Sequence, residues 1–230
     1  MCFPMPRLRY NVTIRIEKID AARPDSRILR QAAALIKKGE VVVCPTDTGY
    51  AFSANALDTK VVARVFNLKG RSYSNPIHVA VSSIEAAGRY AHVNETAKHL
   101  ARHFLPGALT LVLPKRETIP AMLVAGRDTV GIRVPDNRVI LSLAEVTALP
   151  ITTTSANISG RPTPYTVEEV MAQLGETVQK VALVLDQGPL PARELSTIVD
   201  LTGSSPQLIR QGLISWLDIR EVLKGLQSSS

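Results

Sequence analysis

The stretch "CPTDTGYAFSANALD" (residues 44–58) combines Pro, Thr, Gly, Ser and Asn with only two acidic residues, directly after an apolar run. These residue types build tight turns. Their hydroxyl and backbone N–H groups also suit a charged small molecule. The preceding "EVVVCP" predicts a short buried strand that ends at Pro45, because proline has no N–H to donate to a sheet. The stretch is therefore either a plain connection between two core elements or one wall of a site.

Outward from this stretch, strand-like and helix-like segments alternate. Residues 11–18 alternate apolar and polar side chains and predict a strand. Residues 26–39 predict a helix with Ser26 as a possible cap and Gly39 as its end, and residues 58–70 predict another that begins at Asp58. Asn94 caps a helix that is predicted to reach residue 104, and "TVEE" (166–169) matches a capping box. Further strands are predicted in "PIHVAVS" (76–82), "ALTLVLP" (108–114), "TVGIRVP" (129–135), "LPITTTS" (149–155), "VALVLD" (181–186), "STIVDL" (196–201) and "QLIRQG" (207–212). The alternation predicts a three-layer α/β domain with a partly parallel sheet.

Composition narrows the class of protein. The chain has 230 residues, of which 45% are hydrophobic, enough to bury one large core or two small ones. Its apolar runs are strand-sized, so we expect no membrane span. The N-terminus lacks a continuous apolar segment with a cleavage site, so we expect a cytoplasmic protein. Cys2 and Cys44 form no disulfide framework or metal-binding pattern, and Cys44 is predicted to be a small buried residue.

The net charge of +7 is concentrated at one end of the chain. Residues 1–38 hold nine Lys/Arg and three Asp/Glu, which leaves a net charge of +1 for the other 192 residues. A basic arm and first helix can be a solvated face or can contact an RNA backbone. Both interpretations stay open at this point.

Several well-known chemistries are excluded by inspection. The sequence has no G-x-x-x-x-G-K-[ST] loop, no G-x-G-x-x-G, no H-E-x-x-H and no G-x-S-x-G elbow. His99 and His103 have the spacing of a helical metal-binding pair but lack a nearby third ligand, so we expect them on an exposed helix face and predict no metal site.

Polar residues instead gather after the predicted strands and helices. In "KGRSYSNP" (69–76), Arg71 could grip phosphate with its planar fork and Lys69 could add a mobile charge, with Ser74 or Asn75 as hydrogen-bonding groups. Cations at a helix C-terminus can equally be a solvated end. Arg133 lies inside an apolar strand, so it must emerge at an edge or meet an anion. "TTTSANISG" (152–160) is a dense run of hydroxyls.

Seven ordered motifs together resemble the YrdC-like family, the threonylcarbamoyl-AMP synthases. They are "PTDTGYAFSANAL", "KGRSYSNP", "PGALTLVLP", "TVGIRVP", "TTSANISGRPTP", "STIVD" and "LIRQG". The resemblance extends from about residue 25 to residue 215 and is closest to the short, single-domain form. It implies a twisted, mixed open sheet with helices on both faces and a concave, basic site.

The resemblance also implies a reaction. L-Threonine, bicarbonate and ATP would give L-threonylcarbamoyl-AMP and pyrophosphate, and a partner transferase complex would then modify tRNA. Such chemistry needs no protein nucleophile, because the site holds the reactants together and neutralises phosphate charge. Mg²⁺ would be held through the phosphates and water.

Matched residue by residue, the family pattern assigns roles to twelve positions. L-Threonine would be bound by Thr48, Arg133, Thr153 and Ser196, with Arg133 pairing its carboxylate. ATP would be bound by Lys69, Arg71, Asn75, Thr129, Ser155, Thr163 and Arg210. Lys69 and Arg71 are the candidates for catalysis. His78 is a further candidate for threonine, because the family often has His where this chain has Ala80, two residues along the same strand face.

This chain departs from the family at residues 49–53. The family's T-x-Y-G-L-G reads here as Thr48, Gly49, Tyr50, Ala51, Phe52 and Ser53. If the loop needs positive φ at 51 or 53, Ala51 and Ser53 would be strained.

The expected organisation is a basic N-terminal arm and first strand (1–20), a catalytic domain (21–220) and a frayed tail (221–230). Two other classes of function stay open. One is a non-catalytic module for double-stranded RNA or tRNA. The other is a relative of the hydrogenase-maturation carbamoyltransferases, whose zinc-finger and acylphosphatase segments the chain lacks.

Overall fold

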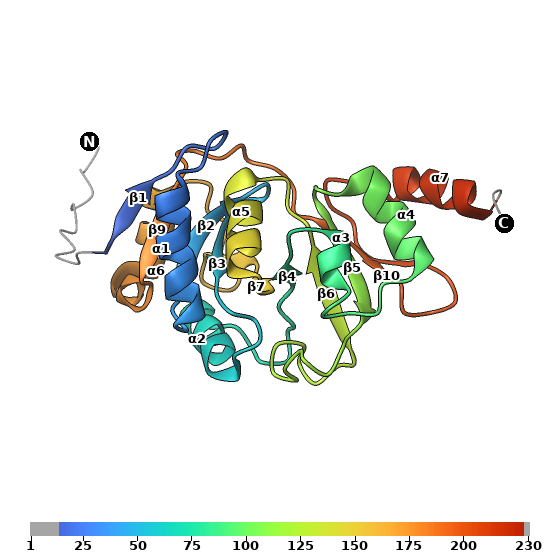
Figure 1. The fold of residues 1–230 in the computed structure, drawn as a ribbon, viewed down its shortest axis with the longest axis horizontal. Helices are drawn as coiled ribbons and strands as arrows, with labels where there is room; N and C mark the ends of the chain where they lie inside the picture. Colours follow the sequence, from blue (N-terminus) through green and yellow to red (C-terminus); the bar gives the residue numbers. More distant parts are fainter. Residues whose placement is uncertain (1–13, 228–230) are drawn as a thin grey trace, which may run out of the picture.

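The computed structural model describes residues 14–227, which fold into two mixed β-sheets and surrounding helices (Figure 1). The five-stranded sheet has the order β1-β9-β2-β3-β8. In it β9 lies parallel to β1 and β2, while β3 is antiparallel to β2 and β8. Its strands are β1 (Ile16–Lys18), β2 (Val42–Thr46), β3 (Gly49–Ser53), β8 (Thr154–Ser155) and β9 (Leu183–Asp186).

The six-stranded sheet has the order β11-β10-β5-β6-β4-β7. Two of its neighbouring pairs are parallel, β10 with β5 and β4 with β6, and the others are antiparallel. Its strands are β4 (Val79–Ala80), β5 (Leu109–Pro114), β6 (Thr129–Arg133), β7 (Ile151–Thr152), β10 (Thr197–Asp200) and β11 (Gln207–Arg210).

The two sheets meet at Thr153. This residue connects β7 of the six-stranded sheet to β8 of the five-stranded sheet. Beside it, the Ala54 N–H donates to Thr152 Oγ1 at 3.0 Å, and the Thr152 N–H donates to the Ala54 carbonyl at 2.9 Å. The predicted α/β fold is therefore confirmed, with its strands divided between two mixed sheets that are hydrogen-bonded at their junction.

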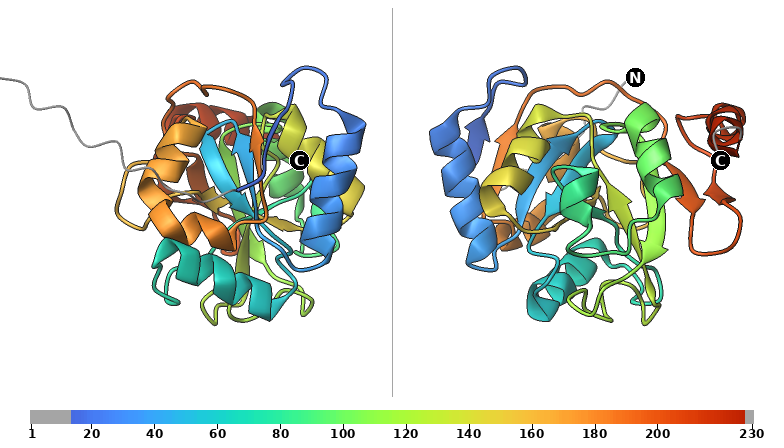
Figure 2. Two further views of the ribbon diagram at one scale, coloured as in Figure 1. Left: turned by 90° about the vertical axis from the view of Figure 1, so that its left-hand side faces the viewer. Right: turned by 45° about the vertical axis from the view of Figure 1, so that its right-hand side comes forward.

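Helices cover both faces of the five-stranded sheet (Figures 1 and 2). On one face, α1 (Ser26–Lys37) and α5 (Arg138–Thr147) pack on Val42, Cys44 and Leu185. On the other, α2 (Thr59–Lys69) and α6 (Val167–Leu174) pack with Val43 and Val184, and a 3₁₀ helix, η1 (Gly175–Lys180), follows α6. The alternation of side chains along each strand explains why neighbouring valines face opposite layers.

The remaining helices lie beside the six-stranded sheet. They are α3 (Ile84–Ala87), α4 (Glu95–Phe104) and α7 (Trp216–Gln227), and α4 and α7 lie side by side. The predicted tail begins at residue 221, but α7 continues to Gln227, with Ile219 fully buried and Val222 packed on the core. Residues 221–227 are therefore not a frayed tail. Residues 228–230 and most of the predicted arm lie outside the described residues.

Helix caps agree with the sequence at three helices and differ at one. Asp58, Asn94 and Thr166 cap α2, α4 and α6, and Thr166 with Glu169 completes the capping box. At α1 the cap is Asp25 and not Ser26, because the Asp25 carboxylate accepts from two backbone N–H groups. The prediction placed this cap one residue too late.

Pro45 does not end its strand, which is a correction to the sequence prediction. It pairs with Tyr50 inside the β2–β3 hairpin. The Tyr50 N–H donates to Pro164 and its carbonyl accepts from Ala156, so this pair does not need the missing proline N–H.

Residues 49–53 form strand β3, so Ala51 and Ser53 carry no left-handed strain. The one positive φ in this segment is at Gly49, at 125°. The condition for strain at positions 51 and 53 is therefore not met, because the positive φ lies at the glycine before the tyrosine.

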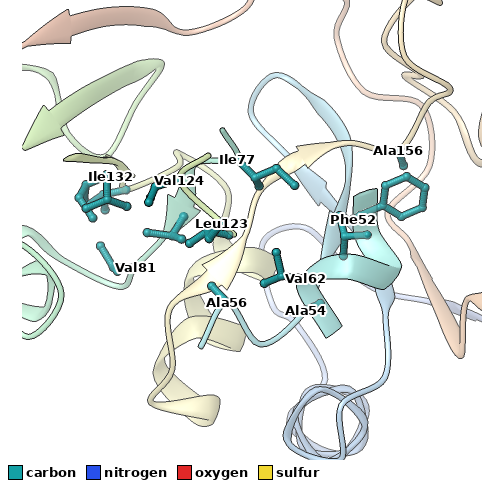
Figure 3. Packing of buried hydrophobic residues seen from close by; sticks show 14 of the residues in the cluster. Phe52, Ala54, Ala56, Val62, Ile77, Val81, Leu123, Val124, Ile132 and Ala156 are labelled. Atoms are coloured by element: carbon teal, nitrogen blue, oxygen red, sulfur yellow. The ribbon is translucent and has the colours of Figure 1, made fainter. Parts of the chain in front are cut away.

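Both sheets contribute to one main hydrophobic cluster (Figure 3). Phe52 and Val62 join it from the five-stranded side, and Ile132 from the six-stranded side. Cys44 is buried as predicted. Within residues 14–227, no helix is both long and apolar enough for a membrane span.

Candidate functional site

A cavity of about 190 Å³ lies where the two sheets meet. Its walls come from the β2–β3 hairpin, the β7–β8 junction, β6 and β11. Eight of the predicted site residues line it: Thr48, Arg71, His78, Arg133, Thr153, Ser155, Ser196 and Arg210. The lining contributed by the described residues contains three arginines and no carboxylate.

The β2–β3 turn forms a hydroxyl-rich wall. Thr46 Oγ1 donates to the Gly49 carbonyl at 2.7 Å and accepts from the Thr48 N–H at 3.1 Å. Gly49 fits closely here, because a Cβ on it would lie 2.4 Å from Thr163 Cγ2. The opening stretch of sequence is therefore both a tight turn and one wall of the cavity.

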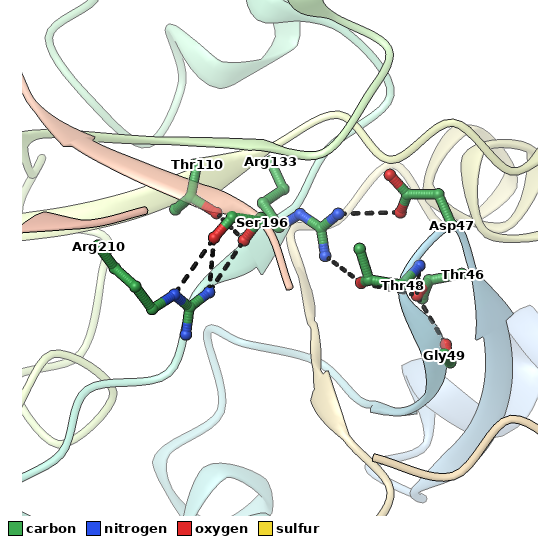
Figure 4. Close-up of polar contacts among 8 residues, drawn as sticks. All are labelled: Thr46, Asp47, Thr48, Gly49, Thr110, Arg133, Ser196 and Arg210. Atoms are coloured by element: carbon green, nitrogen blue, oxygen red, sulfur yellow. Dashed lines mark hydrogen bonds and ion pairs between the residues drawn. The ribbon is translucent and has the colours of Figure 1, made fainter. Parts of the chain in front are cut away.

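Arg133 ends β6 and meets an anion within the protein (Figure 4). Its Nη2 lies 2.9 Å from Asp47 Oδ1, and its Nη1 donates to Thr48 Oγ1 at 3.1 Å. Both side chains of the ion pair are at least 94% buried. Arg133 Nε and Asp47 Oδ2 are buried without a hydrogen-bond partner within residues 14–227. The pair joins the two sheets and leaves one donor and one acceptor unused.

Arg210 on β11 is held by Ser196, and no acidic side chain in the described part of the chain pairs with it. Its Nη2 donates to the Ser196 carbonyl at 2.8 Å, and Ser196 Oγ lies 2.9 Å from Thr110 Oγ1 (Figure 4). Burial, together with Arg133 and Arg71, lowers the pKa of Arg210. Because the neutral carbonyl and hydroxyl of Ser196 orient this guanidinium without neutralising it, its charge remains available to an anionic ligand.

Arg71 is held in the same way on the loop after α2. Its Nε donates to the Asn75 carbonyl and its Nη2 to the Pro76 carbonyl, both at 3.0 Å. The left-handed Gly70, with φ of 56°, ends α2 and turns the chain toward this loop. Among residues 14–227, two of the three arginines in the cavity therefore have no acidic partner.

Lys69 lies beneath the cavity wall and not in it. Its Nζ donates to Asn157 Oδ1 at 2.6 Å and to the Asn157 carbonyl at 3.2 Å, and it also binds the Ser155 carbonyl. Burial, together with Arg71, lowers the pKa of Lys69 to about 7. Ser155 Oγ also donates to Asn157 Oδ1, at 2.7 Å. Lys69 thus supports the loop that carries Ser155.

His78 lines the cavity just before β4. A Cβ on Gly131 would lie 2.5 Å from His78 Cδ2, so the imidazole packs directly on this glycine. Burial is the largest cause, followed by Arg133, Arg210 and Arg71 in that order, and together they lower the pKa of His78 to about 3. The ring is therefore neutral at physiological pH.

Four predicted residues do not line the cavity. Besides Lys69, they are Asn75, which is exposed, Thr163, which packs behind Gly49, and Thr129, at the opposite end of β6 from Arg133. Thr129 is about 13 Å away from Arg133 along the strand. Their roles in binding ATP stay predictions.

Sequence reasoning missed several residues of the site. Asp47 is in the quoted stretch, but its partner is 86 positions away, so no local pattern shows the pairing. Asn157 follows Ser155 by two residues in the hydroxyl run, and this nearness could have identified it as a site residue. The cavity lining also includes Thr46, Gly49, Tyr50, Thr154 and Leu195. Residues 14–227 contain no group of three His, Cys, Asp or Glu side chains that could hold a metal ion.

Comparisons with known proteins identify the fold and the family. The family model Sua5_yciO_yrdC, described as telomere recombination, matches residues 34–212. Threonylcarbamoyl-AMP synthase of Pyrococcus abyssi is 39% identical over 85% of this chain and 57% of that protein. A putative threonylcarbamoyl-AMP synthase of Mycobacterium tuberculosis is also 39% identical, over 93% of this chain and 98% of that protein.

A solved structure agrees with these sequence matches. The crystal structure of P. abyssi Sua5 complexed with L-threonine superposes with a TM-score of 0.85 and 37% identity, over 90% of this chain and 60% of that one. The chain thus spans little more than half of the Pyrococcus protein and nearly all of the mycobacterial one. The chain belongs to the Sua5/YciO/YrdC family.

Proposed function

We propose that this protein is an L-threonylcarbamoyladenylate synthase, a nucleotidyltransferase that uses L-threonine, bicarbonate and ATP. The observation that carries the proposal is the cavity between the sheets, where three arginines converge with hydroxyl groups and no lining carboxylate. Such a lining suits ligands that bring carboxylate and phosphate groups. The names of the relatives support the same activity.

The reaction follows from holding the reactants together. The amine of threonine attacks bicarbonate and gives a carbamate and water. A carbamate oxygen then attacks the α-phosphorus of ATP, and pyrophosphate leaves. Arg71 and Arg210, which pair with no acidic side chain of residues 14–227, stabilise the negative charge that develops on the phosphates.

The size of the cavity indicates which substrate lies inside it and which extends out of it. A volume of about 190 Å³ is below the 300–1,000 Å³ that is common for drug-sized ligands. An amino acid therefore fits inside, and ATP extends outward past the mouth. Mg²⁺ suits this arrangement through phosphates and water, because residues 14–227 offer no cluster of ligands that would enclose it.

The wider role is part of the proposal. Threonylcarbamoyl-AMP is an activated carbamate, which a cytoplasmic transferase complex consumes to form threonylcarbamoyladenosine in tRNA. A non-catalytic module for tRNA or double-stranded RNA is less well supported. The described arginines of the site point into a cavity of amino-acid size, while RNA phosphates need an open basic surface.

The test is pyrophosphate release from ATP, Mg²⁺ and bicarbonate, with and without L-threonine. We expect release that depends on threonine. Pyrophosphate release that does not depend on threonine would overturn the proposal in favour of another reaction. No release, together with salt-sensitive RNA binding, would overturn it in favour of the RNA-binding alternative.

A further inference from the structure

His78 lines the cavity, but the reaction proposed above gives it no role. Strand β4 is parallel to β6, with Val79 beside Ile132 and Ala80 beside Arg133. One residue earlier in this register, His78 lies beside Gly131. The imidazole accordingly packs on Gly131, where an added Cβ would lie 2.5 Å from its Cδ2. Alternate residues share a face, so the imidazole lies on the same face as the Arg133 side chain.

The surroundings of the ring are cationic. Arg133 from β6, Arg210 from β11 and Arg71 from the loop after α2 face it, and the described lining of the cavity contains no carboxylate. The ring nitrogens have no hydrogen-bond partner among residues 14–227, and the side chain is partly accessible from the cavity. His78 is therefore a neutral nitrogen base among fixed positive charges.

This setting bears on a step that the proposed function requires. Free threonine carries an α-ammonium, whose nitrogen has no lone pair with which to attack bicarbonate. The ammonium must therefore lose one proton before its nitrogen can attack. The proton needs an acceptor within the cavity, because the hydroxyl groups there are very weak bases.

We propose that His78 is a catalytic residue that accepts the proton lost by the α-ammonium of the bound amino acid. One N–H bond of the ammonium breaks and one N–H bond forms on the imidazole. The amine lone pair then attacks the carbon of bicarbonate, and the products are the carbamate and one water molecule. This inference rests on the proposed function and deepens it.

Substrate binding makes the proton transfer easier. The carboxylate and phosphates of the substrates bring negative charge to Arg133, Arg210 and Arg71. These arginines are among the causes that hold the pKa of His78 low, so their pairing raises it. Burial is the largest cause and remains, which lets the imidazole release the proton again after the step.

The experiment compares the unsubstituted chain with His78→Gln across pH. Glutamine keeps a hydrogen-bonding side chain but cannot take up a proton. Without the base, the reaction depends on amine that is already deprotonated in solution, and this fraction grows with pH. For kcat/KM with threonine we expect a loss of about 100-fold at pH 6.5 that shrinks to about 3-fold at pH 9.5. Thermal unfolding of the same samples checks that both are folded.

Gly131→Ala provides an independent variant that keeps His78. The added Cβ would meet the imidazole at 2.5 Å and push it from its place. We expect the same pH-dependent loss, and little further loss when Gly131→Ala is added to His78→Gln, because both changes act through one ring.

The outcomes separate the two proposals. A loss of the same factor at every pH, or a loss in threonine affinity alone, would show that His78 is structural and would overturn this inference while leaving the synthase activity intact. Absence of threonine-dependent pyrophosphate release from the unsubstituted chain would overturn the proposed function, and this inference with it.

Discussion

The two walls of the cavity hold their polar groups in different ways. The wall from the five-stranded sheet is a turn that bonds to itself, with Thr46, Thr48 and Gly49 linked within four residues. The wall from the six-stranded sheet carries arginines on separate strands, and Arg133 is held by a residue 86 positions away. The hydroxyl wall is thus a local structure, whereas the arginine wall exists only once the two sheets have met.

Arg133→Ala removes the contact between the two walls and should have the largest effect. Asp47 would stay buried without its partner, and we expect a loss of about 3–5 kcal/mol in the free energy of unfolding, measured by urea denaturation. Threonine affinity should fall more than ATP affinity, because Arg133 lies inside the cavity. The control is Arg133→Ala with Asp47→Asn, which removes both charges and should recover part of the stability. Equal losses of threonine and ATP affinity would contradict the assignment of Arg133 to threonine.

Gly49→Ala tests the hydroxyl wall alone. The backbone there has φ of 125°, and the new Cβ would lie 2.4 Å from Thr163 Cγ2. We expect a loss of about 2–3 kcal/mol in the free energy of unfolding, with reduced threonine affinity, because the turn must shift. Gly160→Ala is the matched control, since Gly160 also has positive φ, 86°, but open space around its Cβ. If both variants lose the same stability, backbone strain alone explains the effect.

Lys69 should make the stability of the protein depend on pH. Its pKa is lowered to about 7 by burial and Arg71, from 10.5 when unfolded. The unfolded chain therefore binds more protons between these values, and stability should rise with pH, by about 1.5 kcal/mol between pH 7 and pH 8.5. Urea denaturation of the unsubstituted chain and of Lys69→Met over this range gives the measurement. The variant should lack the rise, and equal slopes would show that the amine of Lys69 is not its source.

The sequence predicted what local physics determines. The caps at Asp58, Asn94 and Thr166 and the helix end at Gly70 were correct, because each depends on neighbours within a few residues. Seven of the eight predicted residues that line the cavity came from the ordered motifs taken together, and His78 came from its position two residues before Ala80. Taken singly, each of those hydroxyl residues is as typical of a turn as of a binding site.

What the sequence could not predict depends on contacts between distant segments. Pro45 continues its strand because Pro164 and Ala156 satisfy Tyr50 instead. Asp47 looked like an ordinary turn residue, and its role follows from the position of β6. The burial of α7 against the core likewise depends on α4 and not on the polar residues at the end of the chain.

The smallest expected effect concerns Tyr50, which ties the hydroxyl wall to β9. Its hydroxyl donates to the Gly188 carbonyl at 2.7 Å and accepts from the Gln187 N–H at 3.1 Å. Tyr50→Phe keeps the fully buried ring and removes these two bonds and the longer one to Asp186 Oδ1 at 3.4 Å, so we expect a loss of about 1 kcal/mol in the free energy of unfolding. Tyr73→Phe is the matched control, because Tyr73 is 47% exposed and should change stability very little. A Tyr50→Phe variant as stable as the control would mean that water replaces these bonds without cost. The bond from the Gly188 N–H to Asp186 Oδ1 and the bond from Asn137 Nδ2 to Gln187 Oε1 would then be enough to hold the loop after β9.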